Sequence, residues 1–273
     1  MKDKILLIND LPGYGKVALS AMIPVLSHMG FDLYNLPTAL VSNTLDYGKF
    51  EILETTEYMK NTLSVWEQLD FSFNAISTGF IVSEEQVQLI ADYCQEQAQN
   101  GTAIFVDPIM GDDGRLYNGI TQKTVEYMRE LCSVADYIVP NYTEAAFLAE
   151  MEIKTSGISL EEGYELINKL RKLGSKSIVI TSANLLGKAT VIGYDYKENE
   201  YFNLPFKYIP VRFPGTGDIF SAVMMGKVLS AAPLQDGVQK AMDYVKDIII
   251  LNKDNVDKFK GIPIETWLDK MDI

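Results

Sequence analysis

The sequence predicts an α/β fold built on a mostly parallel, doubly wound sheet. Short β-rich runs alternate with helical patterns along most of the chain, and this alternation favours parallel strands joined by crossover helices. Two neighbouring β-rich runs close to residue 200 predict an antiparallel hairpin at the edge of the sheet. With 273 residues and 47% hydrophobic content the chain can bury a large core, and we expect one domain over residues 1–273.

Each expected element follows from its local pattern. The aliphatic run 4–8 predicts a buried strand, and 16–29 predicts a helix that contains Pro24 and ends at Gly30. Further strands are expected at 31–40, 74–77, 103–106, 137–139 and 177–181, with helical patterns such as 84–97 and 160–173 between them. The hairpin pairs 189–196 with 200–206, and two helices, 217–230 and 234–252, close the chain.

Composition argues against several classes of function. A formal charge of −13 and the lack of a Lys and Arg cluster argue against nucleic-acid binding. Cys94 and Cys132 lie in helical patterns without metal-ligand spacing, which predicts reduced core thiols. His28, the one histidine, is expected on the surface at a helix end, although a role as a base stays open. No signal peptide or membrane-spanning run is recognisable, so we expect a cytoplasmic protein.

The most informative motif is a glycine-rich turn at 214–217 that leads into an apolar helix. Gly215 and Gly217 allow the backbone to approach an anion, and the N–H groups of the first helical turn point at it. Asp218 follows directly. A carboxylate beside a phosphate site is best explained as the base that takes a proton from an attacking hydroxyl. An ordinary turn with a helix cap remains an alternative for the motif alone.

Polar residues follow most of the expected parallel strands. Ligands bind beyond the carboxyl ends of strands in such sheets, so these clusters are expected to share one edge. Each cluster alone also fits a turn or a helix start. The clusters are Asn9-Asp10, Thr78-Gly79-Phe80, Asp107-Pro108-Ile109-Met110-Gly111-Asp112, Asn141-Tyr142-Thr143-Glu144 and Thr181-Ser182.

These motifs resemble the ribokinase-like superfamily and, within it, the pyridoxal, pyridoxine and pyridoxamine kinases of vitamin B6 salvage. The resemblance covers nearly the whole chain in the same order. It implies a three-layer α/β/α fold, a homodimer, and phosphorylation of a hydroxymethyl group by ATP with Mg²⁺ and a monovalent cation such as K⁺. It rests on Gly215-Thr216-Gly217-Asp218, residues 107–112, Asn141-x-x-Glu144 and Thr181-Ser182, supported by Tyr14-Gly15, Ser20, Ser42-Asn43, Tyr47-Gly48 and Thr78-Gly79-Phe80.

The resemblance implies roles for individual residues. Asp218 would be the catalytic base, with Gly215, Thr216 and Gly217 as the anion hole. Glu144 would hold the Mg²⁺ solvation network, with Tyr117 beside the metal, and Mg²⁺ prefers hard oxygen ligands. We expect the Glu144 side chain to lie outside the core, so that its removal leaves the chain folded. ATP would contact Asp107, Asp112, Val139, Asn141, Thr181, Ser182, Lys207 and Ile209.

The expected substrate site departs from the resembling family. Asp10 stands where B6 kinases commonly have Ser, Phe80 where they have Tyr, and Asp46 where relatives have an uncharged residue or His. Asp10 as a loop cap and Phe80 as a packing residue stay open. Added carboxylates favour a cationic amine by up to about 3 kcal/mol, so pyridoxamine is the leading substrate. The substrate set is Asp10, Ser42, Asp46, Tyr47, Phe80 and Asp218.

The sequence also bears on four other functions. Gly13-Tyr14-Gly15-Lys16 suggests a P-loop, but Asp10 occupies the first glycine position and Val17 follows the lysine. A Rossmann dehydrogenase lacks support because no Gly-x-Gly-x-x-Gly follows the first strand. A hydroxymethylpyrimidine kinase of thiamine salvage and a non-catalytic vitamer-binding module on the same fold remain alternatives.

Overall fold

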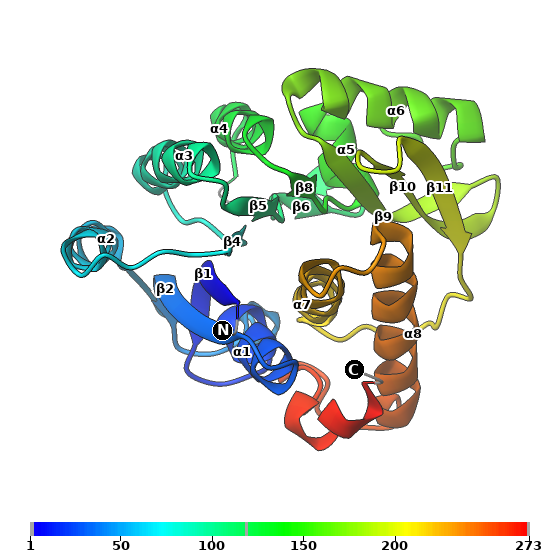
Figure 1. Ribbon diagram of the computed structural model, residues 1–273. Coiled ribbons are helices and arrows are strands. Elements are labelled where there is room, and N and C mark those ends of the chain that lie inside the picture. The colour runs from blue at the N-terminus through cyan, green and yellow to red at the C-terminus, as the bar shows by residue number, and fades with distance from the viewer. Residues whose placement is uncertain (1–2, 118–119, 272–273) are drawn as a thin grey trace. The chain divides into compact units, whose positions relative to one another are not determined.

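The computed structural model describes residues 3–117 and 120–271, which fall into two compact units (Figure 1). The first unit joins the chain up to Val82 with the chain from Ile209 onward, and the second runs from Ser83 to Tyr208. The first unit is therefore made of two segments that are distant in sequence. The single domain over residues 1–273 stays a prediction.

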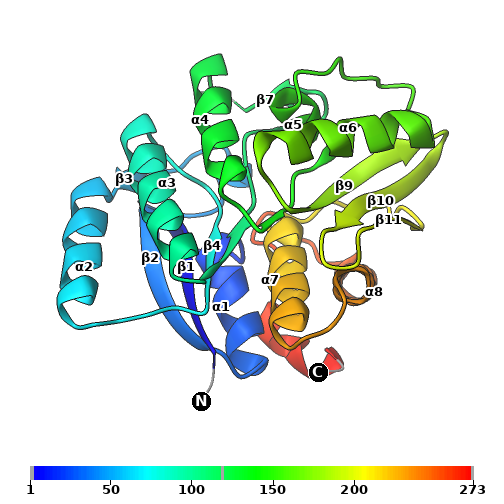
Figure 2. The ribbon, with the colours of Figure 1, turned by 45° about the horizontal axis from the view of Figure 1, so that its top comes forward.

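The strands of the first unit follow the order β4-β1-β2-β3, and β1 lies beside β2 in Figure 2. β1 pairs in parallel with β2 and β4, whereas β3 runs antiparallel to β2. The aliphatic run from Ile5 to Ile8 is fully buried, as expected for a central parallel strand. The strands are β1 (Lys4–Pro12), β2 (Asp32–Val41), β3 (Ile52–Glu54) and β4 (Ala75–Thr78).

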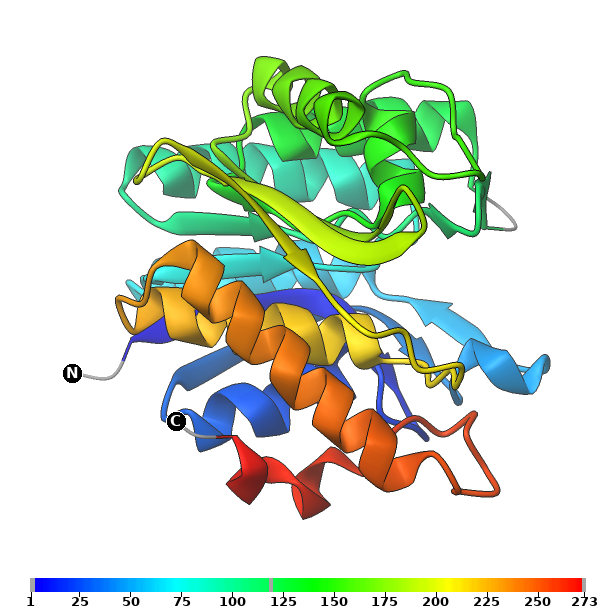
Figure 3. The ribbon, with the colours of Figure 1, turned by 90° about the vertical axis from the view of Figure 1, so that its right-hand side faces the viewer.

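The helices of the first unit pack on one another as well as on the sheet. α1 contacts β1 and α7, and α8 packs obliquely across α7 (Figure 3). Because α7 is enclosed in this way, its residues from Ile219 to Gly226 are all buried. The helices are α1 (Ala18–His28), α2 (Thr56–Gln68), α7 (Thr216–Leu229) and α8 (Leu234–Asn252), with short 3₁₀ turns η1 (Leu45–Tyr47), η2 (Ile264–Thr266) and η3 (Leu268–Lys270).

The strands of the second unit follow the order β11-β10-β9-β8-β5. β5, β8 and β9 are parallel, and β9, β10 and β11 are antiparallel, so the predicted edge hairpin is confirmed. Its strands are β5 (Ala103–Val106), β8 (Tyr137–Ile138), β9 (Ser177–Leu185), β10 (Lys188–Asp195) and β11 (Glu200–Pro205). A separate two-stranded ribbon pairs β6 (Gly111–Asp112) with β7 (Arg115–Leu116).

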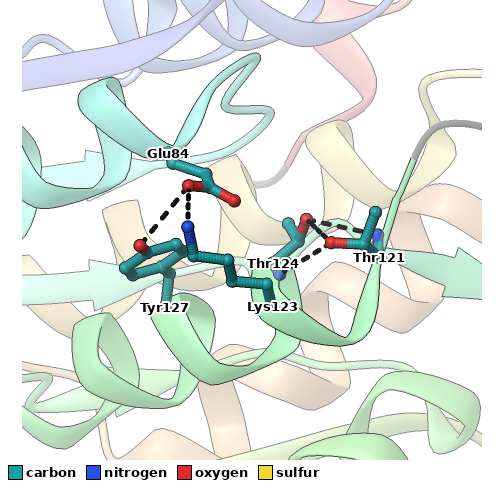
Figure 4. Close-up of polar contacts among 5 residues, drawn as sticks. All are labelled: Glu84, Thr121, Lys123, Thr124 and Tyr127. Carbon is teal, nitrogen blue, oxygen red and sulfur yellow. Dashed lines mark hydrogen bonds and ion pairs between the residues drawn. The ribbon is translucent and has the colours of Figure 1, made fainter.

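The helices of the second unit begin at side-chain caps, which satisfy N–H groups that lack helical partners. They are α3 (Glu84–Gln99), α4 (Gln122–Ser133), α5 (Tyr142–Leu148) and α6 (Leu160–Leu173), capped by Ser83, Thr121, Asn141 and Ser159. The Glu84 carboxylate connects the exposed start of α3 to α4 through two contacts. Glu84 Oε2 accepts from Lys123 Nζ at 2.5 Å and from the Tyr127 hydroxyl at 3.4 Å (Figure 4).

The predicted α/β class is confirmed, and most element positions agree. Two strands are longer than predicted. β1 continues pairing with β2 as far as Pro12, so Asp10 lies within the strand rather than after it. β9 continues to Leu185 because β10 pairs with its second half, so Thr181 and Ser182 also lie within a strand. The first helix starts at Ala18 rather than Lys16 because Val17 is extended, with φ −133°.

The remaining predictions from composition concern the two cysteines, His28 and membrane-spanning helices. Cys94 and Cys132 are fully buried, and burial raises the pKa of the Cys94 thiol to about 12. His28 is exposed at the last turn of α1, as predicted. In the part of the chain that the structure describes, every helix is too short or too polar to cross a membrane.

Candidate active site

The glycine-rich turn forms the start of α7 in the first unit. Gly215 is the N-cap, with φ +84°, and a Cβ there would lie 2.0 Å from the Lys16 carbonyl oxygen. Only glycine fits this position without displacing the backbone. A Cβ on Gly217 would meet no atom within 4 Å, so the space beside this residue is open. The turn therefore combines a tightly packed glycine with an accessible one.

Asp218 lies in the first turn of α7 and is held by two donors. Its Oδ2 accepts from the backbone N–H of Ala18 at 2.8 Å, and its Oδ1 accepts from Asn9 Nδ2 at 3.4 Å. Ala18 provides its N–H from φ +47°, a left-handed conformation that is costly for a residue with a Cβ. Burial raises the pKa of Asp218, and the two donors partly offset that increase.

Asp10 lies close enough to Asp218 for the two charges to interact. It occupies the irregularity in the β1–β2 pairing, where the register shifts between Asn9 and Leu11. Burial, followed by the charge of Asp218, raises the pKa of Asp10 to about 7. None of the ion pairs formed by the described residues includes Asp10. The site thus contains two carboxylates whose pKa values are both raised by burial.

Asn9, which has no role predicted from the sequence, bonds Asp218 through its Nδ2 and the backbone of Asp10 and Phe80 through its Oδ1. It is 2% exposed, and its Oδ1 accepts from the N–H groups of Asp10 at 3.0 Å and Phe80 at 2.8 Å. The Phe80 carbonyl in turn accepts from Thr38 Oγ1. The signal in the sequence was a polar residue directly after an aliphatic run, but two of its partners, Phe80 and Asp218, are distant in sequence.

The other predicted substrate residues all have protein partners in the first unit. Ser42 is exposed and bonds within its own loop, to Asn43 and to the Glu51 N–H. Asp46 faces Arg212 at 3.8 Å. The Tyr47 hydroxyl donates to Asp257 Oδ2 at 2.6 Å, and its ring packs against Tyr14 and Phe259.

Glu144 in the second unit corrects an expectation. Its side chain is buried, with 3% exposure, and not outside the core. Oε1 accepts from the N–H groups of Met110 at 3.0 Å and Gly111 at 3.4 Å, while Oε2 accepts from the Asn141 N–H at 2.9 Å. The chain buries this carboxylate because the loop after β5 and the start of α5 both supply donors to it. Burial raises the pKa of Glu144 above its usual range, and the backbone donors partly offset that increase.

Several predicted nucleotide and metal residues gather around Glu144. The charge of Asp112 acts on Glu144, and Asn141 Nδ2 donates to the Gly111 carbonyl. Tyr117 donates its N–H to the Met110 carbonyl, and Thr181 forms a parallel bridge with Asn141. Among the described residues, no group of three or more His, Cys, Asp and Glu side chains is arranged to hold a metal ion.

The remaining nucleotide residues differ in exposure. Asp107 is half-buried, and Val139 is buried beside β5. Ser182 is exposed with φ +58°, at the irregularity between β9 and β10. Lys207 is exposed and lines a hollow of 410 Å³ with Lys188, Phe206 and four other residues of the second unit. Ile209 begins the returning segment of the first unit and is half-buried.

Comparison with known proteins identifies the family. The model of the family described as phosphomethylpyrimidine kinase matches residues 21–263. The chain belongs to this family. A pyridoxal kinase of Dictyostelium discoideum is 26% identical over 266 residues, which cover 91% of this chain and 86% of that protein.

Solved structures of two kinases are similar to this chain. A Bacteroides thetaiotaomicron protein assigned as a phosphomethylpyrimidine kinase, in a crystal form with pyridoxal, has a TM-score of 0.94 and 33% identity, covering 100% of this chain and 96% of that one. Pyridoxal kinase from Leishmania donovani, in complex with ADP and ginkgotoxin, has a TM-score of 0.89 and 26% identity, covering 99% and 96%. The predicted α/β fold and kinase class are therefore confirmed.

Proposed function

We propose that this kinase-family chain transfers a phosphoryl group from ATP to the 5′-hydroxymethyl group of a B6 vitamer. The observation that carries the proposal is the carboxylate of Asp218 at the start of α7, next to the open space beside Gly217. The pyridoxal in the Bacteroides relative and the ADP in the Leishmania relative support the two substrates. Salvage of pyridoxal 5′-phosphate would be the role of such an enzyme.

The proposed chemistry assigns one task to each part of the turn. Asp218 takes the proton of the substrate hydroxyl as the oxygen attacks phosphorus, a contribution of roughly 10²–10⁴-fold for a positioned base. The N–H groups of Thr216 and Gly217 stabilise the charge that builds on the transferring phosphoryl oxygens. Gly215 allows the turn to lie against the Lys16 carbonyl.

Mg²⁺ fits the second unit through water and phosphate rather than through a cage of side chains. Asp112 and Glu144 bring hard carboxylate oxygens together, but both oxygens of Glu144 already accept backbone N–H groups. Bound Mg²⁺ would neutralise phosphate charge. Glu144 would orient the Mg²⁺ water shell, while Tyr117 would lie beside the metal. A monovalent cation such as K⁺ is part of the same proposal.

Pyridoxamine is the vitamer that we propose as preferred. Asp10 has no cationic protein partner among the described residues, and its raised pKa reports the cost of leaving its carboxylate buried without one. A protonated aminomethyl group would provide that partner. Asp46 is a weaker candidate because Arg212 already faces it at 3.8 Å.

A hydroxymethylpyrimidine kinase is the second candidate. The matching family carries the phosphomethylpyrimidine kinase description, and an aminopyrimidine also presents an amine to Asp10. A non-catalytic vitamer-binding module is the third. An intact Gly215-Thr216-Gly217-Asp218 motif argues against the third candidate, because binding alone does not require a base.

One experiment separates the three candidates. ATP consumption with Mg²⁺ is measured over pyridoxamine, pyridoxine, pyridoxal and hydroxymethylpyrimidine, with Asp218→Asn as the matched inactive control. Turnover of the vitamers supports the first proposal, and turnover of the pyrimidine alone supports the second. Vitamer binding in calorimetry with no ATP consumption would leave the non-catalytic module.

We further propose a cytoplasmic homodimer, which the resemblance to B6 kinases implies. Sedimentation equilibrium of the purified chain tests the assembly. A mass equal to that of one chain at micromolar concentration would contradict it.

A further inference from the structure

The orientation of the Asn9 amide follows from its partners. Two backbone N–H groups, those of Asp10 and Phe80, point at one terminal atom of the side chain. An N–H group cannot donate to an NH₂ group, so this atom is the carbonyl oxygen. The NH₂ group then lies on the opposite side. There it meets Asp218 Oδ1 at 3.4 Å and the Met22 sulfur at 3.7 Å.

The amide is confined in this orientation. A Cβ on Gly79 would lie 2.3 Å from Asn9 Nδ2 and 2.6 Å from Oδ1, so any other residue at 79 would collide with the amide. Asn9 is 2% exposed and directly follows the fully buried run from Ile5 to Ile8 of β1. A side chain that is packed and bonded at both ends loses little further entropy when it holds a neighbour.

We propose that Asn9 is a positioning residue for the phosphoryl-transfer reaction, one that fixes the Asp218 carboxylate and keeps it ionised. The inference rests on the proposed function of Asp218. Ala18 bonds Oδ2 at 2.8 Å, and Asn9 contacts Oδ1 at the longer distance of 3.4 Å. Oδ1 is therefore the less strongly bonded oxygen and the better proton acceptor. Asn9 sets the direction in which this oxygen points.

Loss of the Asn9 donor has a defined electrostatic sign. The donor lowers the pKa of Asp218, in opposition to burial, so removing it raises that pKa and reduces the ionised fraction at a given pH. Asp10 is the neighbouring group that titrates, from the same strand as Asn9. In α1 the one titratable side chain is the exposed His28. In α7 the one titratable side chain besides Asp218 is Lys227, in the last turn, and Lys16 pairs with Glu265.

The test combines two readouts on Asn9→Ala and Asn9→Asp. Carbon-13 NMR of aspartate-labelled protein follows the titration of the Asp218 carboxylate without any need for turnover. The Asp218→Asn variant assigns its signal. An Asp10→Asn background removes the titration of Asp10. Vitamer kinetics against pH follow the acidic limb of kcat/KM. We expect the Asp218 titration and the acidic limb to move together to higher pH, and kcat to fall about tenfold.

A matched control separates positioning from structure. Asn252 is also buried in the first unit, and its Nδ2 donates to the Ile248 carbonyl. Asn252→Ala should lower stability as Asn9→Ala does, but leave the pH profile unchanged. An unmoved Asp218 titration in the Asn9 variants would overturn the proposal. If Asn9→Ala does not fold, the isosteric Asn9→Asp decides by the same titration. If the Asp218 titration moves as expected in the variants but the wild type phosphorylates no substrate, the result would contradict the proposed function instead.

Discussion

Asp218 and Glu144 are both carboxylates in the first turn of a helix, yet their surroundings differ. Glu144 in the second unit is 3% exposed, and three backbone N–H groups donate to its two oxygens. Asp218 in the first unit has two donors, one of them at 3.4 Å, and lies beside the open space at Gly217. Backbone N–H groups alone hold the Glu144 carboxylate, whereas a side-chain amide holds one oxygen of Asp218 through a longer contact.

A difference of this kind distinguishes the contacts of a structural carboxylate from those that a proton-accepting carboxylate requires. A carboxylate whose oxygens are all occupied by backbone donors fastens two chain segments together, and its removal leaves those donors unpaired. A carboxylate with free acceptor capacity can take a proton from a substrate. We therefore expect substitutions at Glu144 to affect stability first and substitutions at Asp218 to affect turnover first.

The largest expected effect is that of Asp218→Asn. The variant should fold and bind ATP but lose turnover by roughly 10²–10⁴-fold, because the amide cannot accept the substrate proton. Single-turnover kinetics with saturating ATP measure the loss, and calorimetry checks nucleotide binding. Near-normal kcat would mean that the base is another residue.

Glu144→Gln should act mainly on stability. One end of the amide cannot accept, so a buried N–H of the 107–112 loop or of Asn141 loses its partner, at a cost of about 1–3 kcal/mol. Urea unfolding measures the change, and a Mg²⁺ titration of activity shows whether the metal requirement also rises. An unchanged urea midpoint together with an unchanged Mg²⁺ requirement would remove Glu144 from both roles.

Asp10→Ser should narrow or reverse the preference for pyridoxamine over pyridoxal by about 1–3 kcal/mol, because the amine loses its charged partner. In the wild type the preference should increase as pH rises through about 7, where Asp10 ionises. The measurement is kcat/KM for both vitamers against pH, with Asp46→Ser and the double variant to detect coupling. Equal kcat/KM for the two vitamers in every variant would leave Asp10 without a role in selectivity.

The same substitution has a stability effect with a fixed sign. The pKa of Asp10 rises from its ordinary value of 3.8 to about 7 on folding, so the folded state binds more protons within that window. Relative to Asp10→Ser, the wild type should therefore lose stability as pH rises from about 4 to above 7. Thermal unfolding at several pH values checks this, and the opposite slope would contradict the burial of Asp10.

The smallest effect is expected at Glu84, a third carboxylate in the first turn of a helix. Its ion pair with Lys123 is exposed at both side chains, 47% and 58%, and solvent and salt weaken such pairs. Lys123→Met should leave both turnover and the melting temperature within experimental scatter. A large loss of either would show that exposed helix-start carboxylates also matter here, which would weaken the contrast between Asp218 and Glu144.

Sequence patterns located most elements because strand and helix periodicities are local. β5 and α6 agree with their predicted ranges, and the edge hairpin agrees within a residue. The strand ends were harder to predict. The pairing of β1 with β2 beyond Asn9, and that of β9 with β10, depends on partner strands whose positions local periodicity does not contain.

The site shows the same division at the level of single residues. The Gly215-to-Asp218 motif was recognisable because its glycines and its carboxylate are adjacent in the chain. Tyr47 was recognisable through the resemblance, but its bond to Asp257, which lies 210 residues away, was not. The Glu144 carboxylate was expected outside the core because a charged residue near a helix start is usually exposed.

By itself the sequence determined the fold class, the glycine-rich turn at 214–217 and the presence of a carboxylate next to it, since these depend on local periodicity and on adjacent residues. Tertiary structure alone decided which donors each carboxylate meets. The donors around Asp218 and Glu144 include backbone N–H groups supplied by Ala18 and Met110, which are distant in the chain. Burial and those donors together set the pKa of each group, and only folding brings them together.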